Sequence, residues 1–149
     1  MNEEIDNIIT SWCSQVIEDI RQVLIDKNVN ATGSLSDSLR PEIKENEIII
    51  WAKPHAIWTD RGRGATKNDN GGELIEAIKE WVIAKRVNLN PYAITKKIHQ
   101  EGTKLHREGG NREVFDNASF WEPRIKDLQD KLRFTYINKI NSITSELWQ

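Results

Sequence analysis

The stretch Ile48 to Gly64, IIIWAKPHAIWTDRGRG, constrains the fold more than any other part of the chain. It begins with three isoleucines and a tryptophan, and such β-branched and aromatic residues favour a pleated, mostly buried surface. Pro54 ends the run, because proline has no N–H for a β-ladder. We therefore predict a strand over about residues 47–53, whereas the longest apolar patterns elsewhere have helical spacing.

A loop is expected where the stretch ends in Asp60-Arg-Gly-Arg-Gly64. Gly62 and Gly64 can adopt backbone angles that are closed to other residues. Arg61 and Arg63 would then be presented from an adaptable turn, which suits contact with a partner better than catalysis.

The segment 60–72 as a whole is expected to be mobile in the free chain and ordered when it docks on a partner. It contains four glycines and several polar turn formers, so little of it can be buried. Its own packing would not offset the entropy lost on ordering, roughly 1 to 2 kcal/mol per residue.

Long apolar patterns with helical spacing lie at both ends of the chain. Residues 3–26 have acids in the first turn and apolar groups at Ile5, Ile8, Ile9, Trp12, Val16, Ile20, Val23 and Leu24. Glu122-Pro123 is expected to open a last helix, whose core stripe is Ile125, Leu128, Leu132, Tyr136, Ile140, Ile143 and Leu147. Phe134, Ile137 and Trp148 fall off that stripe, and this second apolar face is expected to contact another subunit.

Shorter elements fill the middle of the chain. Ser34 and Asp37 predict a capped helical turn that ends near Ser38. Two strands, about 39–44 and 47–53, are expected around Glu45-Asn46, with Pro41 placing the first at a sheet edge. Helices are expected at about 73–86 and, after an Asn90-Pro91 start, at about 91–100, with Ile94 and Ile98 facing inward and an irregular stretch following.

These elements predict an α+β fold with a long N-terminal helix, a small antiparallel sheet built on a hairpin, two middle helices and a long C-terminal helix. A length of 149 residues suits one domain, residues 1–149. The chain lacks a membrane-length apolar run and starts with acids, so it is expected to stay in the cytoplasm where it is made. Its single cysteine, Cys13, is expected to be a small buried hydrophobe.

Charge is unevenly distributed along the chain. Residues 1–28 hold six acids and two bases, a net charge of -4, whereas residues 85–112 hold seven bases and two acids, a net charge of +5. The segments could be solvated surface, complementary patches between copies, or, for the basic one, a footprint for nucleic acid.

Catalysis and cofactor binding are not expected. The common nucleophile, phosphate-binding and zinc motifs are lacking, and the histidines, His55, His99 and His106, form no telling pattern. They are interpreted as surface residues. Asp60 could act as a general base, but an ion pair with a neighbouring arginine is the preferred interpretation.

The tryptophans divide into two groups. Trp12 and Trp81 lie on helix stripes and are expected in the core. The others are expected near the ends of elements, where large amphipathic rings often lie in interfaces: Trp51, Trp58, Trp121 and Trp148.

The order of several short motifs resembles the tailed-bacteriophage family of tail-completion and head-tail connector (neck) proteins of the lambdoid minor tail type. The likeness spans about residues 3–145 and rests on Thr32-Gly-Ser-Leu35 with Ser38-Leu-Arg40, Lys53-Pro-His-Ala-Ile-Trp-Thr-Asp-Arg-Gly62, the helix Leu74 to Lys85, and Ala93-Ile-Thr-Lys-Lys-Ile98 leading to Glu101-Gly-Thr-Lys104. The chain departs from the pattern at His55 and Trp58, where tyrosines are usual, and at Arg63, which replaces a threonine.

The resemblance implies a structural, non-catalytic subunit of a ring at the head-tail junction or upper tail of a virion, assembled in the host bacterial cytoplasm. Its partners would be further copies and portal, connector or tail-tube proteins, with possible passing contact with DNA and none with membrane. Candidate subunit or partner contacts are Trp58, Asp60, Arg61, Gly62, Arg63, Gly64, Lys104, Phe134, Ile137 and Trp148.

Two other functions remain open at this point. One is a nucleic-acid-binding module that uses residues 85–112 with Arg61 and Arg63, because Arg-Gly repeats occur in such modules. The other is a hydrolase centred on Asp60 and the histidines.

Overall fold

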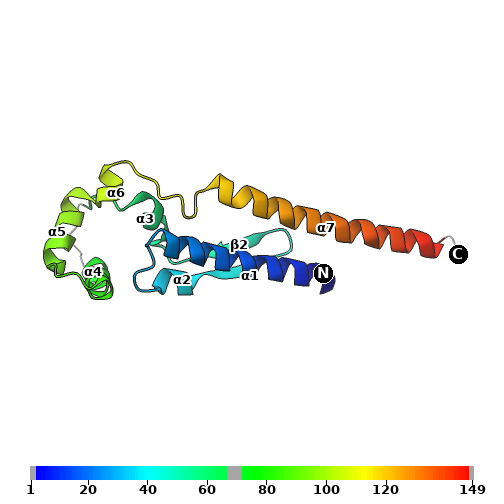
Figure 1. Cartoon of the computed structure of the whole chain (residues 1–149), viewed down its shortest axis with the longest axis horizontal. Coiled ribbons are helices and arrows are strands. Elements are labelled where there is room, and N and C mark those ends of the chain that lie inside the picture. The colour runs from blue at the N-terminus through cyan, green and yellow to red at the C-terminus, as the bar shows by residue number, and fades with distance from the viewer. Residues whose placement is uncertain (1–2, 67–71, 148–149) are drawn as a thin grey trace. The chain divides into compact units, whose positions relative to one another are not determined.

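The computed structural model describes residues 3–66 and 72–147 of the chain (Figure 1). Within those residues it has seven helices and two strands, which confirms the predicted α+β class. In chain order they are α1 (Glu3–Asp26), α2 (Ser34–Ser38), β1 (Arg40–Ile43), β2 (Ile48–Trp51), α3 (Ala56–Arg61), α4 (Gly72–Lys85), α5 (Pro91–Glu101), α6 (Lys104–Arg107) and α7 (Ala118–Leu147).

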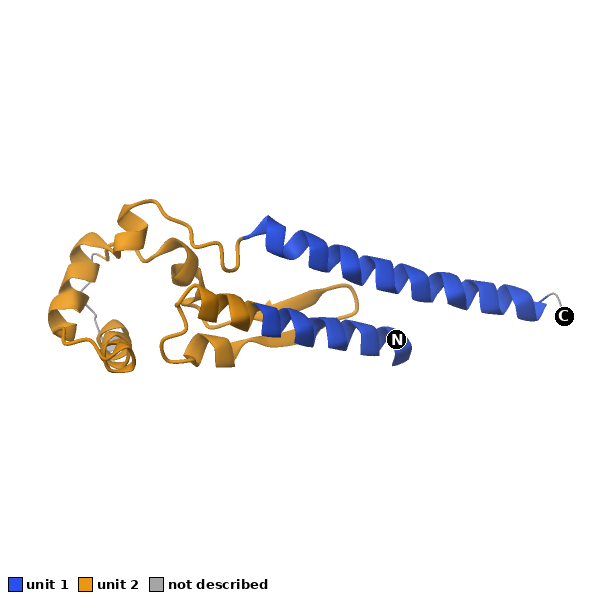
Figure 2. Cartoon of the chain, in the orientation of Figure 1, with its two compact units in different colours: residues 1–19, 117–149 blue, residues 20–116 orange. Residues whose placement is uncertain are grey.

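The chain divides into two compact units (Figure 2). One unit comprises residues 1–19 with 117–149, and the other comprises residues 20–116. The boundary between them lies inside α1, so this helix belongs to both. Whether the chain is a single cooperative domain stays a prediction.

Helix α1 forms as its sequence predicts. Glu3, Glu4 and Asp6 lie in the first turn, where the positive end of the helix dipole favours acids. Its buried face includes Val16, Ile20 and Leu24, and Cys13 is fully buried there as expected of a small hydrophobe. Burial raises the pKa of the Cys13 thiol, so the reactive thiolate is disfavoured.

The hairpin is antiparallel and pairs Arg40 with Trp51 and Ile43 with Ile48. Pro41 is tolerated because a two-stranded sheet has only edge strands. Ile48 to Ile50 are half-buried and Trp51 is exposed, so the prediction of a mostly buried strand is wrong. Among the described residues the sheet has only these two strands, so each strand is an edge strand.

The short helix α2 has its N-cap one residue earlier than predicted, at Gly33 instead of Ser34. Gly33, with φ of 76°, is its N-cap and supplies no side-chain cap, so the expected capping role of Ser34 is wrong. The Ser34 N–H is instead 3.3 Å from the Thr32 hydroxyl.

Helix α5 has the predicted start. The Asn90 side chain accepts a hydrogen bond from the Tyr92 N–H at 3.0 Å, and Pro91 occupies the first turn. The residues that this helix buries are Thr95 and His99, whereas Ile94 and Ile98 are half-buried.

Helix α7 starts earlier than predicted, and Pro123 lies inside it. The Asn117 carbonyl accepts hydrogen bonds from the N–H groups of Phe120 and Trp121 at 3.1 and 3.2 Å. These bonds form a helical turn before Pro123, so the proline does not mark the first residue. One proline near a helix start removes one backbone hydrogen bond without ending the helix.

Neither of the two tryptophans expected in the core is fully buried. Trp12 and Trp81 are both half-buried. The Trp12 Nε1–H donates to the Arg124 carbonyl at 2.8 Å. Because the indole N–H needs such a hydrogen-bonding partner, the ring does not lie in a wholly apolar core.

Candidate interaction surface

The segment after Pro54 contains a helix, α3, which carries Trp58 and the first two residues of the expected loop, Asp60 and Arg61. Gly62 ends this helix at φ of 74°, a conformation that favours glycine. The loop prediction is therefore wrong for residues 60 and 61, which form the last turn of α3. Glycine favours loops, but it also ends helices as a C-cap, which is the role of Gly62.

Asp60 is buried, with 3% of its surface exposed. One carboxylate oxygen accepts the Val114 N–H at 2.7 Å, and the other accepts the N–H groups of Phe115 and Asp116 at 2.8 and 3.0 Å. These three backbone donors take the place of the arginine partner that the sequence suggested, so that prediction is wrong. The carboxylate holds the 114–116 turn and is not presented to solvent as a general base.

The two arginines of the segment have different surroundings. Arg61 is exposed and forms an ion pair with Asp116 at 2.9 Å. Arg63 lies over the Trp58 ring, with 4.8 Å between the guanidinium carbon and the ring centroid. Trp58 and Arg63 are thus brought together, and stacking of this kind is typical of guanidinium groups. Their use as one contact surface stays a prediction.

Gly62 and Gly64 lie against α6. A Cβ atom on Gly62 would be 2.5 Å from the His106 backbone nitrogen, and one on Gly64 would be 3.2 Å from the His106 ring. The Arg63 N–H donates to the Thr103 hydroxyl at 3.0 Å, and the Arg63 carbonyl accepts the Thr103 N–H at 2.8 Å. Both glycines therefore permit close packing.

Residues 62–66 are an irregular segment, as predicted, but the expectation that they lack packing of their own is wrong. The Thr66 N–H donates to the His99 carbonyl at 2.9 Å, and the Thr66 hydroxyl is hydrogen-bonded to the His99 ring. Residues 67–71, which belong to the same predicted mobile segment, lie outside the described residues.

The three histidines have different surroundings. His99 is buried, contrary to its interpretation as a surface residue, and His106 packs on Gly64. His55 is the N-cap of α3, and partial burial with the charge of Lys53 lowers its pKa. Among residues 3–66 and 72–147, no cluster of three metal-binding side chains is present.

Lys104 lies at the start of α6, directly after Thr103. Its ammonium group is 3.7 Å from the Glu108 carboxylate, and its side chain is highly exposed. In the same basic segment, Arg107 pairs with Glu101 at 2.9 Å and Lys85 donates to the Asn28 side chain at 2.6 Å. Part of the positive charge of residues 85–112 is thus engaged inside the chain.

Helix α7 exposes its predicted second face. Phe134 is 68% exposed, and Ile137 is also exposed. Their role in a subunit contact stays a prediction, and Trp148, the third member of this face, lies outside the described residues.

The stripe of α7 expected in the core is covered only between Leu128 and Leu132, because its first member, Ile125, is 45% exposed. Leu128 is buried and Leu132 is half-buried, and Thr135 is the last buried residue of the helix. The later members of the stripe are all exposed: Tyr136 (51%), Ile140 (61%), Ile143 (51%) and Leu147 (78%). The prediction that the whole stripe is core is wrong, because α7 continues past the start of α1 (Figure 2).

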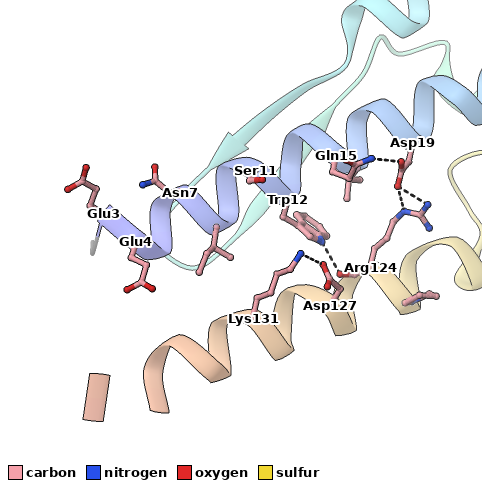
Figure 3. A pocket seen from close by; sticks show the side chains of 13 residues that line it. Glu3, Glu4, Asn7, Ser11, Trp12, Gln15, Asp19, Arg124, Asp127 and Lys131 are labelled. Carbon is pink, nitrogen blue, oxygen red and sulfur yellow. Dashed lines mark hydrogen bonds and ion pairs between the residues drawn. The ribbon is translucent and has the colours of Figure 1, made fainter. Parts of the chain in front are cut away.

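A groove of about 1030 Å³ lies between α1 and the first half of α7 (Figure 3). Its apolar residues on α1 are Ile8, Trp12 and Val16, which are spaced four residues apart. Asp19 pairs with Arg124 at 2.8 Å. Asp127 pairs with Lys131 at 2.7 Å, which leaves the net negative charge of the groove on Glu3 and Glu4.

Sequence reasoning missed this groove and the roles of Thr103 and His99. The four-residue spacing of the α1 apolar groups was visible, but it indicates one helix face and not the distance to a second helix. Thr103 could have been found as an N-cap, since threonine precedes α6 and accepts the His106 N–H at 3.4 Å.

In the part of the chain that the structure describes, every helix is too short or too polar to span a lipid bilayer. Comparison of the chain with models of protein families, with curated proteins and with solved structures found no match.

Proposed function

We propose that this chain is a structural subunit that assembles with copies of itself into a ring at the head-tail junction or upper tail of a tailed bacteriophage. The observation that supports self-assembly is the exposed apolar stripe on the second half of α7, from Tyr136 to Leu147. Neighbouring portal, connector or tail-tube proteins would be its other partners.

The exposed half of α7 is costly for an isolated chain. Residues 136–147 extend about 18 Å as a helix, and helices gain most of their stability by packing an apolar face. A run of large apolar side chains on one face of an exposed helix is typical of an interface. A protein partner that covers this face would supply the missing packing.

The location in a virion rests on the motif resemblance. It comes from the segments around Thr32, Lys53 to Gly62, and Glu101 to Lys104. The close packing of Gly62 and Gly102 supports the joint use of the last two segments as one surface, since a Cβ atom on Gly102 would be 2.8 Å from the Arg63 carbonyl.

The nucleic-acid-binding alternative has less support. Lys85, Lys104 and Arg107 contact groups within the chain, and Gly62 and Gly64 have a packing role that an Arg-Gly recognition segment does not need. Steep loss of DNA affinity with rising salt, measured on the purified chain, would favour this alternative.

The test combines solution mass with imaging. Native mass spectrometry of the purified chain, alone and with its portal or tail neighbours, should give one closed oligomer of fixed copy number. Imaging of particles that contain the chain should place that ring on the tail axis. A single off-axis copy per particle, or a chain absent from particles, would contradict the proposal.

A further inference from the structure

The second half of α7 and the groove between α1 and the first half of α7 have complementary chemistry. We propose that residues 136–147 of one copy bind in the α1/α7 groove of a second copy, an inference that rests on the proposed self-association. The contact would place an exposed apolar stripe on a partly apolar groove floor.

The apolar surfaces correspond in length. On α1 the groove extends from Glu3 to Asp19, about 26 Å of helix, and its accessible apolar groups there are the half-buried Ile8 and Trp12, since Val16 beneath them is buried. Residues 136–147 of α7 form about 18 Å of helix and carry Tyr136, Ile140, Ile143 and Leu147 on one face. One helix lying along the groove would therefore meet most of its floor, as in helix-in-groove recognition.

The charges are also complementary. Glu3 and Glu4 give the groove its net negative charge. On α7, Arg133 lies three residues before Tyr136, and Lys139 lies four residues before Ile143, so the two bases border opposite sides of the stripe. Glu146 lies on the same side as Lys139, and residues 133–147 keep a net charge of +1. Opposite charges around an apolar centre fix the orientation of a docked helix.

The chain cannot fill its own groove with this segment. The groove residues of α7 end at Lys131, and residues 136–147 continue the same unbroken helix. Folding back would require α7 to break. A small apolar ligand also fits poorly, because most groove residues are polar or charged, whereas small-molecule sites are mainly apolar. An amphipathic helix from a second copy, with Arg133 and Lys139 beside its apolar stripe, meets both requirements.

A cross-linking experiment on the full chain tests the contact. Chains with Glu4→Cys are mixed with chains carrying Lys139→Cys and treated with a flexible bis-maleimide. Cross-links should join the two kinds of chain. Asn141→Cys, on the opposite face of α7, is the matched control and should give few products, as should the unsubstituted chain, whose Cys13 is buried. Cross-links only between identical Lys139→Cys chains would show α7 pairing with α7 and overturn the inference.

Charge reversal provides a second measurement. Glu3→Lys with Glu4→Lys, or Arg133→Glu with Lys139→Glu, should each weaken self-association about three- to tenfold at low salt. The chain that carries all four changes should recover most of the affinity. Equal weakening in the combined chain would overturn the inference, and circular dichroism checks that each variant is helical.

The two proposals can fail separately. A ring without the Glu4–Lys139 cross-link keeps the proposed function and overturns the groove contact. The cross-link within a closed pair of chains keeps the groove contact and overturns the ring. A chain that stays monomeric with all its neighbours overturns both.

Discussion

At the scale of single residues, Asp60 connects α3 to a turn that follows it by more than fifty residues. Asp60→Ala would leave three backbone N–H groups of residues 114–116 without their acceptor. We expect a loss of about 3 kcal/mol in the free energy of unfolding, because each buried donor left without a partner costs about 1 to 3 kcal/mol. Urea unfolding measures this loss.

Asp116→Ala is the matched control for the Asp60 prediction. Asp116 is an exposed partner of Arg61, and surface ion pairs contribute about 0 to 1 kcal/mol. Comparable losses in the two variants would show that the buried carboxylate does not hold the turn.

His55 gives the fold a dependence on pH. Partial burial and the charge of Lys53 lower its pKa in the folded chain below the usual 6.5. The unfolded chain then binds more protons in this range, so the contribution of His55 to stability is present above about pH 6.5 and is lost as the pH falls. His55→Gln should reduce the loss of stability between about pH 7.5 and pH 5, as measured by urea unfolding at each pH. An unchanged pH profile would exclude His55 as a source of this dependence.

The difference between Asp60 in the sequence and in the structure has a physical reason. Its neighbours Trp58 and Arg61 made a local ion pair the natural expectation. The donors that it actually meets are the backbone N–H groups of residues 114–116, far along the chain. Every residue except proline has such a group, so the sequence does not show which of them a carboxylate will bind. The pairing of Thr103 with Arg63 was hidden for the same reason.

At the scale of elements, apolar periodicity predicted where the helices lie better than it predicted which of their faces are buried by other elements. The charge pattern and apolar spacing of α1 predicted its full extent, and Asn90-Pro91 predicted the start of α5. For α7 the same spacing predicted a continuous apolar stripe, but spacing cannot say where the helix that covers it begins. Because α1 starts at Glu3, the stripe beyond Thr135 is left uncovered.

Helix α7 should therefore show two kinds of apolar residue. Leu128→Ala removes a buried side chain and should lower the free energy of unfolding by about 2 to 5 kcal/mol. Phe134→Ala and Ile137→Ala change exposed side chains and should stay within about 0.5 kcal/mol, while weakening assembly. Thermal melts and sedimentation measure the two effects.

One result would contradict this prediction for α7. If Phe134→Ala destabilises the monomer as strongly as Leu128→Ala, the second face is buried in the folded chain. It would then be unavailable as a subunit contact.

At the scale of the whole molecule, the uneven distribution of charge was visible in the sequence, but which charges are paired within the chain was not. The acids at the start of α1 line one end of a groove, whereas part of the basic segment 85–112 is paired within its own unit. The net charges of -4 and +5 therefore overstate how strongly those two segments could attract each other between copies.

The remaining prediction concerns the chain without residues 136–149. The deletion removes the exposed half of α7 but keeps Leu128, Leu132 and Thr135, so the covered part of the helix should still fold. If assembly depends on the removed stripe, the full chain should melt at a temperature that rises with protein concentration, because association stabilises the folded state by mass action. The shortened chain should melt at a temperature that does not change over about a hundredfold range of concentration. A full chain carrying Ser142→Asp, on a side of the same helix away from both the Tyr136–Leu147 stripe and the Phe134 and Ile137 face, should behave like the unchanged protein. A concentration-dependent melt of the shortened chain would place the main contact between copies outside residues 136–149.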